Sequence, residues 1–136
     1  MAFEYKLESL GFLTSDSNLN PYGFVAGVDH QYKLVKQVAG GQFTPVTDAA
    51  DVAVGVLQGH PDLGEAGVVA TSGVSKVMAG GVVTEAAAVY MLADGTVADS
   101  SAAGARFIGT AMDSGTAGQI VSIMLAELNA STDVQA

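Results

Sequence analysis

Glycine and small apolar residues recur along this chain at a fixed spacing. Gly27 falls on Gly81 when the sequence is shifted by 54 positions, and residues 27–71 then match residues 81–125 without a gap. Further identical pairs are Val28 and Val82, Val35 and Val89, Ala39 and Ala93, Gly41 and Gly95, Ala49 and Ala103, Gly55 and Gly109, and Gly64 and Gly118. The shift predicts two related β units, with glycines at turns and at close backbone approaches. Because Gly, Ala and Val are common here, chance matches are easy, and different strand orders in the two segments would make the repeat an artefact of composition.

Short apolar runs alternate with turn residues along most of the 136 residues, a length typical of one domain. This pattern predicts a mainly β fold: a small β-barrel or β-sandwich-like body with at most one or two short helices and an internal two-fold repeat. Thr84–Ala88 favours a short helical turn that runs into a strand. We predict an extended N-terminal arm (1–21), a β-rich domain (22–126) and a flexible C-terminal tail (127–136).

The first residues alternate between apolar and charged side chains. Phe3, Tyr5 and Leu7 are separated by Glu4 and Lys6, which is the period of a strand. One interpretation is a frayed chain terminus. The other is a strand that adds to the edge of a partner's sheet, with Phe3, Tyr5 and Leu7 on one face. We predict the second, with an arm that is mobile in the free protein and dispensable for folding.

The charge of the chain excludes several classes of partner. Its formal net charge is −9, and the five basic residues are scattered along the sequence. Nucleic acids and anionic membranes are bound by clustered Lys and Arg, so neither is an expected partner. The chain has no cysteine, which fits assembly in a reducing cytoplasm. Glu4 and Glu8 interrupt the N-terminal residues, which therefore do not resemble a signal peptide.

No constellation of residues predicts catalysis or metal binding. His30 and His60 are the two histidines, and a zinc site needs three or four converging ligands. We expect both to be exposed loop residues. Asp48 and Asp51 lack the further oxygen ligands of a calcium loop and are expected to cap a short turn. The sequence predicts no enzyme activity, no cofactor and no metal.

A family resemblance is carried by Gly73–Thr84 together with residues 89–97. These runs resemble the capsid decoration, or head cement, proteins of tailed double-stranded DNA bacteriophages. The flanking segments 54–57, 108–111 and 118–123 fit the same Gly/Val pattern, and the resemblance covers about residues 32–125. Glu85 stands where a glycine often follows the threonine in this family.

The resemblance implies a structural protein on the outer surface of the virion's capsid, assembled in the host cytoplasm. Such proteins commonly form homotrimers, bind the major capsid protein and stabilise the expanded shell against the pressure of packaged DNA. The arm, with Phe3, Tyr5 and Leu7, would add to the capsid contact. The alternatives are a tail or head-fibre component, and a β-barrel module that binds a carbohydrate or another small ligand. The absence of tryptophan weakens the carbohydrate alternative.

Overall fold

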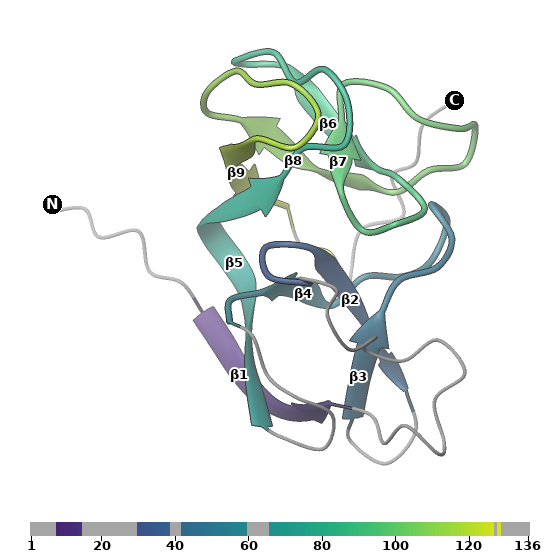
Figure 1. The fold of residues 1–136 in the computed structure, drawn as a ribbon, viewed down its shortest axis with the longest axis vertical. Coiled ribbons are helices and arrows are strands. Elements are labelled where there is room, and N and C mark those ends of the chain that lie inside the picture. The colour runs from purple at the N-terminus through teal and green to yellow at the C-terminus, as the bar shows by residue number, and fades with distance from the viewer. Residues whose placement is uncertain (1–7, 15–29, 39–41, 60–65, 127, 129–136) are drawn as a thin grey trace, which may run out of the picture.

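The fold was obtained as a computed structural model, which describes residues 8–14, 30–38, 42–59, 66–126 and 128. Nine strands and no helix occur in this part of the chain, and the predicted mainly β fold is confirmed (Figure 1). The strands are β1 (Glu8–Thr14), β2 (Leu34–Val38), β3 (Gln42–Pro45), β4 (Gly55–Leu57), β5 (Ala66–Met78), β6 (Ala88–Met91), β7 (Val97–Ala98), β8 (Phe107–Ala111) and β9 (Ile120–Leu125). No helix long and apolar enough to cross a membrane occurs among the described residues.

The first five strands form a closed ring, which is the lower body in Figure 1. Their order is β1-β3-β2-β4-β5, and β1 closes the ring by pairing with β5 as well as with β3. The β1–β5 pairing is antiparallel, with Leu13 opposite Ala66, whereas the β1–β3 pairing is parallel, with Thr14 opposite Phe43. We call this ring, through Ser72, the first unit.

Strand β5 continues into a second ring, the upper body in Figure 1. From Gly73 onward β5 pairs with β9, and β8, β6 and β7 follow in that order. A parallel bridge between Ala79 and Val97 closes this ring, which we call the second unit. Gly73, where the strand leaves one ring for the other, has a φ of 85°, a conformation that favours glycine. One 13-residue strand therefore belongs to both units.

The strand pairings of the two units correspond residue by residue under the 54-position shift. Lys36 lies opposite Thr44, and the equivalent Tyr90 lies opposite Ala98. The same correspondence holds for the pairs Leu34–Val56 and Ala88–Thr110, Val35–Gly55 and Val89–Gly109, Val56–Ala70 and Thr110–Met124, and Leu57–Val69 and Ala111–Ile123. The predicted repeat is therefore confirmed, with the same strand order in both segments. Gly41 lies outside the described residues, so its predicted equivalence to Gly95 stays a prediction.

Backbone conformation follows the repeat as well. Two described residues other than glycine have positive φ, Tyr32 at 64° and Ala86 at 72°, and they are 54 positions apart. Tyr32 donates its N–H to Leu57 O at 2.7 Å, and Ala86 donates to Ala111 O at 2.8 Å. Left-handed backbone is unfavourable for these residue types, so its occurrence at equivalent places indicates one shared turn geometry.

The predicted N-terminal arm is partly incorporated into the first ring. Leu10 pairs with Val69 in the same way as Ser75 pairs with Ile123, so β1 is the first-unit equivalent of the second part of β5. Residues 8–14 are thus a strand of the folded body, although the sequence analysis assigned them to the arm. Deleting residues 2–13 would remove most of this strand, and it is not expected to leave the body intact.

One local expectation is also corrected. The short helical turn expected over Thr84–Ala88 is a tight turn, in which Ala87 donates its N–H to Thr84 O at 3.0 Å before β6 begins. Positive φ at Ala86 prevents a helical turn here. Strand β5 runs through Gly73 without a break, because this glycine accommodates the bend between the two halves of the strand.

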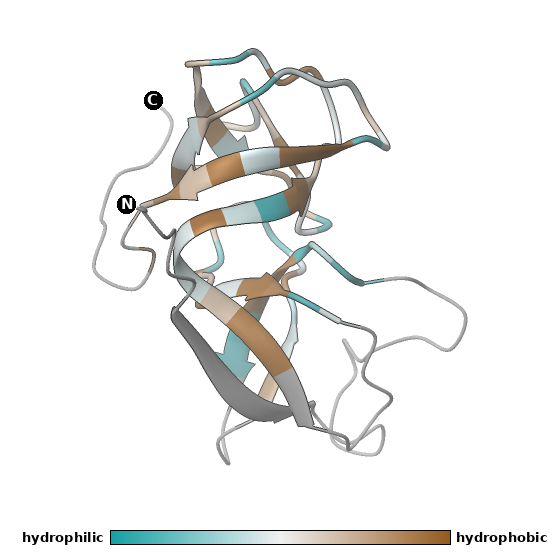
Figure 2. Ribbon diagram, turned by 90° about the vertical axis from the view of Figure 1, so that its left-hand side faces the viewer, coloured by the Kyte–Doolittle hydropathy of each residue, from teal (hydrophilic) through white to brown (hydrophobic). Residues whose placement is uncertain are grey.

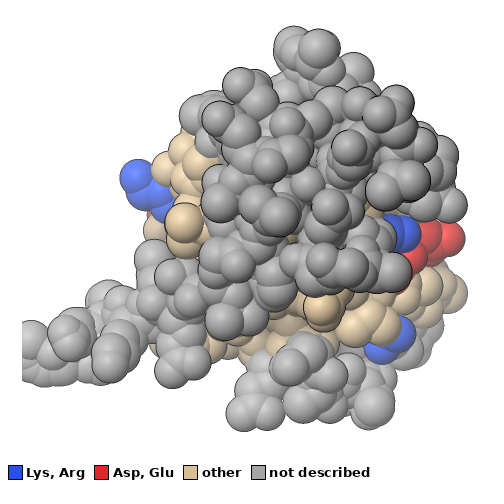
Figure 3. Space-filling model, turned by 90° about the horizontal axis from the view of Figure 1, so that it is seen from below, with Lys and Arg blue, Asp and Glu red and all other residues tan. Residues whose placement is uncertain are grey.

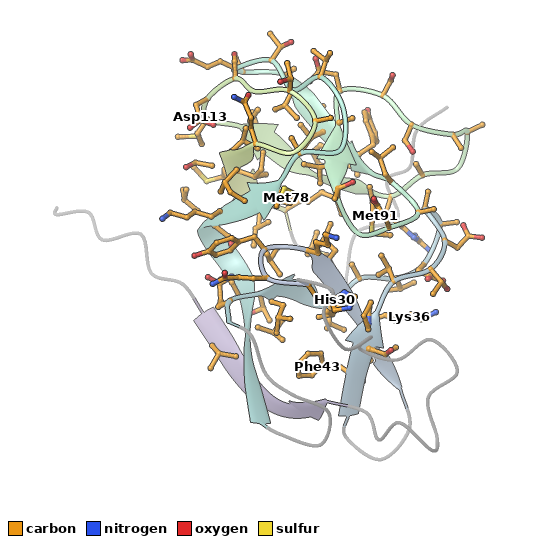
Figure 4. The ribbon with its side chains drawn as sticks, in the orientation of Figure 1. His30, Lys36, Phe43, Met78, Met91 and Asp113 are labelled. Carbon is orange, nitrogen blue, oxygen red and sulfur yellow. The ribbon has the colours of Figure 1, made fainter. Side chains whose placement is uncertain are left out.

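The side chains of a strand point alternately to the inside and the outside of each ring. Figure 2 colours the apolar residues of the strands brown. In the first unit a small core faces inward and consists of Val35, Phe43, Leu57 and Val69. The equivalents in the second unit, Val89, Val97, Ala111 and Ile123, belong to a larger core. That larger core also contains Leu34, Val56 and Ala70, which point out of the first ring. The first unit therefore packs its outer face on the second unit, and Met91 lies between the two bodies (Figure 4).

Candidate functional site

Of the two histidines considered as candidate ligands, the structure describes His30. His30 is half-buried rather than exposed as expected, and its carbonyl oxygen accepts the N–H of Lys33 at 3.1 Å. His60 lies outside the described residues. Within the described part, no group of three His, Cys, Asp or Glu side chains is placed to hold a metal ion.

Two carboxylates hold the loop from Thr47 to Asp51, as predicted for Asp48 and Asp51. Asp51 Oδ2 accepts the N–H of Thr47 at 2.9 Å and of Asp48 at 3.1 Å, and it lies 3.0 Å from Lys36 Nζ. Asp48 Oδ1 accepts the N–H of Ala50 at 2.8 Å. Burial by itself raises the pKa of Asp51, but the hydrogen bonds from Thr47, Lys36 and Asp48 outweigh it and hold the pKa below its ordinary value.

This loop should contribute stability that depends on pH. A carboxyl group whose pKa is lowered by folding stabilises the protein above its unfolded pKa, about 4 for Asp, and loses that contribution as the pH falls through the folded pKa. We expect Asp51→Asn to be less stable than wild type at pH 7, by a small amount because the pair is partly exposed. The difference should shrink as the pH falls below about 4, towards and through the lowered folded pKa of Asp51. Urea unfolding across this range measures the difference. Asp48→Asn is the control, because the described residues contain no cationic partner of Asp48. A difference independent of pH would contradict the assignment.

The residues predicted to dock on a partner, Phe3, Tyr5 and Leu7, lie outside the described residues. They precede β1 directly in the chain, so they are connected to a strand of the first ring. Figure 3 views the molecule from below, and the described charged residues that are visible lie at separate places. They do not gather into a basic patch in this view.

An apolar surface covers the outer side of β8 and β9 in the second unit. Met112, Ile120 and Met124 are 41%, 40% and 43% exposed. Met124 lies opposite Thr110 on β8 and Val74 on β5 in the strand register. The exposed Ala88 pairs with Thr110, so Ala88, Thr110 and Met124 form a row across three strands. We call the surface formed by Ala88, Thr110, Met112, Ile120 and Met124 the β8–β9 face.

The loop between β8 and β9 is held by hydrogen bonds at the edge of this face. Asp113, labelled in Figure 4, accepts the N–H of Ser122 on its Oδ1 at 2.9 Å. Gln119 Oε1 accepts the N–H of Thr116 at 2.8 Å. The β8–β9 face is therefore built on paired strands and a braced loop. Exposed apolar clusters of this kind are typical of surfaces that bind a partner.

The β8–β9 face was not among the sites predicted from the sequence. Its signal is the run Ile120–Leu125, in which five of six residues are apolar. A strand with one solvated face is expected to carry polar residues on that face, whereas two of the three outward residues of β9, Ile120 and Met124, are apolar and Ser122 is the polar one.

Comparison with known proteins places the fold. No protein-family model matches the sequence, and no curated protein matches it. Among solved structures, the chain is similar to the N-terminal base of the head fibre protein gp8.5 of bacteriophage phi29. The two chains share a fold. The TM-score is 0.62 at 14% sequence identity, and the match covers 93% of this chain and 99% of the other.

Proposed function

We propose that this chain is a structural virion protein of a bacteriophage that binds the outer surface of the capsid. The observation that carries the proposal is the fold shared with a phage head-fibre base along nearly the whole of both chains. The sequence resemblance to capsid decoration proteins, found without reference to fold, supports the same location. The proposed role is non-enzymatic: as a homotrimer the protein binds the major capsid protein and stabilises the expanded shell.

A head-fibre component is the second candidate, because the matched structure is the base of a head fibre. Both candidates require attachment to the outside of a capsid, and they differ in whether the domain supports a fibre. A carbohydrate- or ligand-binding module receives no comparable support from the described residues.

The proposal is tested by mixing the purified protein with expanded, undecorated capsids. Cryo-microscopy should show added density on the outer surface at defined lattice positions, and the protein should co-sediment with the capsids. Density at symmetry axes without protruding fibres supports the decoration role. Failure to co-sediment at saturating protein concentration would contradict capsid binding.

The N-terminal residues provide a specific prediction about that contact. We expect the triple variant Phe3→Ser/Tyr5→Ser/Leu7→Ser to bind capsids at least roughly tenfold more weakly than wild type. Burial of a large apolar side chain is worth roughly 1.5–3 kcal/mol, offset by the cost of ordering the segment. The matched control is Glu4→Ser/Lys6→Ser, which changes the opposite face of the same segment. Equal capsid affinity for the triple variant and the control would show that Phe3, Tyr5 and Leu7 do not dock.

A further inference from the structure

The two units make a specific contact within the chain. Leu34, Val56 and Ala70 form a row on the outside of the first ring, and each is 0% exposed because the second unit covers it. Gly95, in the turn between β6 and β7, accepts the N–H of Leu34 at 2.8 Å. At the edge of the contact, Arg106 donates its backbone N–H to Ala49 O at 2.9 Å and its Nε–H to Ala50 O at 3.1 Å.

The 54-position repeat places an equivalent row on the outside of the second unit, and that row is exposed. The equivalents of Leu34, Val56 and Ala70 are Ala88, Thr110 and Met124, the central row of the β8–β9 face. All three are exposed, and Met112 and Ile120 extend the apolar surface around them. The loop Ala49–Ala50, which receives Arg106, has its equivalent in Ala103–Gly104, where Ala103 is also exposed.

The first unit carries a residue suited to cover this second row. The position equivalent to Arg106 is Val52, which is 50% exposed. Arg106 of the second unit contacts the loop Ala49–Ala50 of the first unit. In the equivalent contact, the apolar side chain of Val52 would therefore lie on the small residues Ala103–Gly104. Val52 is one of six large hydrophobic residues exposed in the described part, and its place in the repeat is that of Arg106, which contacts the other unit.

We propose that the β8–β9 face binds the first unit of a second copy of this chain. The contact repeats between chains the packing that joins the two units within a chain, with Val52 of one copy on Ala103–Gly104 of the next. A second copy of this chain fits the β8–β9 face, because within each chain the second unit already covers the row Leu34, Val56 and Ala70. This row is equivalent to the central row of the β8–β9 face. The contact is heterologous, so copies associate head to tail and close into a ring when the rotation permits. This inference deepens the homotrimer of the proposed function by naming its contact surfaces.

Three charge substitutions at exposed positions test the contact. Met124→Glu changes the row and Val52→Glu changes the opposite surface, whereas Val68→Glu is the matched control, at a strand residue that is 50% exposed. We expect Met124→Glu and Val52→Glu each to raise the dissociation constant of the oligomer at least roughly tenfold, since each buries an unpaired charge. Val68→Glu should leave it unchanged. Sedimentation velocity across a concentration series measures assembly, and circular dichroism verifies that the variants are folded.

Mixing the two variants distinguishes a head-to-tail contact from a symmetric one. Met124→Glu retains an intact first-unit surface and Val52→Glu retains an intact β8–β9 face, so the mixture should form a heterodimer although each variant alone is monomeric. An oligomer that withstands Val52→Glu, or a mixture that stays monomeric, would overturn the head-to-tail contact. A trimer that persists in Met124→Glu would overturn the contact and leave the homotrimer standing. A wild type that is monomeric at all concentrations in solution and also on capsids would overturn both the contact and the homotrimer.

Cross-linking provides a second measurement that does not depend on disrupting the contact. The chain has no cysteine, so single introduced cysteines are unique. Val52→Cys protein mixed with Ala103→Cys protein should form an intermolecular disulfide under mild oxidation, because the equivalent pair within the chain, Arg106 and Ala49, is hydrogen-bonded backbone to backbone. Val68→Cys mixed with Ala103→Cys is the control. Equal cross-linking in the two mixtures would overturn the proposal.

Discussion

Gly109→Ala is expected to lower the free energy of unfolding by about 3 kcal/mol, and Gly55→Ala by a similar amount. Gly109 lies on β8, where an added Cβ would press into the backbone carbonyl of Met124 and the side chain of Ile123. At Gly55 the Cβ would meet the carbonyl of Ala70 and the side chain of Val69. A backbone carbonyl cannot give way without displacing the paired strand, so both substitutions should disrupt the sheet.

Gly59→Ala is the matched control for these two substitutions. No atom of the described residues lies within 4 Å of a Cβ added at Gly59, and the φ of Gly59 is not positive. Its stability should therefore change by less than about 1 kcal/mol, with stabilisation possible through lower entropy of the unfolded chain. Urea unfolding followed by circular dichroism measures all three variants. If Gly55→Ala or Gly109→Ala had the stability of the wild type, the paired strands at that glycine would be able to move apart at little cost in free energy.

The same two glycines explain why the repeat could be predicted from the sequence. Gly55 and Gly109 each lie against the backbone of the strand that follows in the sheet, and the atoms they approach belong to the equivalent residues Ala70 and Met124. Close backbone approach tolerates no side chain, so the requirement for glycine is kept at both places. The order of the strands within each unit depends on which strands pair, and the sequence pattern does not encode that pairing.

The part of the fold that escaped prediction lies where the repeat changes its spacing. Leu10 and Ser75 are equivalent in structure, yet they are 65 positions apart, because residues 15–29 separate β1 from the rest of its unit. Aligning the sequence with itself at a shift of 54 therefore does not place Leu10 on Ser75. The two side chains also differ in type. The alternation of residues 3–7 predicts a strand near the N-terminus, but sequence alone does not show that the chain continues to Thr14 as a strand paired with both β3 and β5.

The candidate surface was missed for a different reason. In the first unit, Leu34, Val56 and Ala70 show that apolar residues on the outside of a ring are covered by a neighbouring body. Sequence indicates that Met124 and Ile120 are apolar, but their place outside the second ring follows from the register of β9 with β8. The repeat indicates which kind of surface covers such a row, because the equivalent row of the first unit is covered by the second unit. Neither the sequence nor the exposed fraction of the side chains indicates this alone.

Exchanging the residues of the two rows should produce opposite effects on folding. Ala70→Met is expected to destabilise the protein by about 3 kcal/mol, because Ala70 is 0% exposed and a methionine cannot fit between the units without displacing them. Met124→Ala should change stability by less than about 1 kcal/mol, because Met124 already reaches solvent and a small residue at this place is compatible with the strand. Each substitution puts into one unit the residue that the other unit carries at the equivalent position.

The two variants also separate folding from assembly. Because β5 belongs to both rings and the larger core spans both units, Ala70→Met should shift one cooperative urea transition rather than divide it into two. A biphasic transition would show that the units fold independently and that their contact contributes little. Met124→Ala, with an unchanged unfolding midpoint, should still weaken self-association, since it removes exposed apolar surface from the β8–β9 face. Loss of stability in Met124→Ala comparable to that in Ala70→Met would mean that this face already belongs to the core of a single chain.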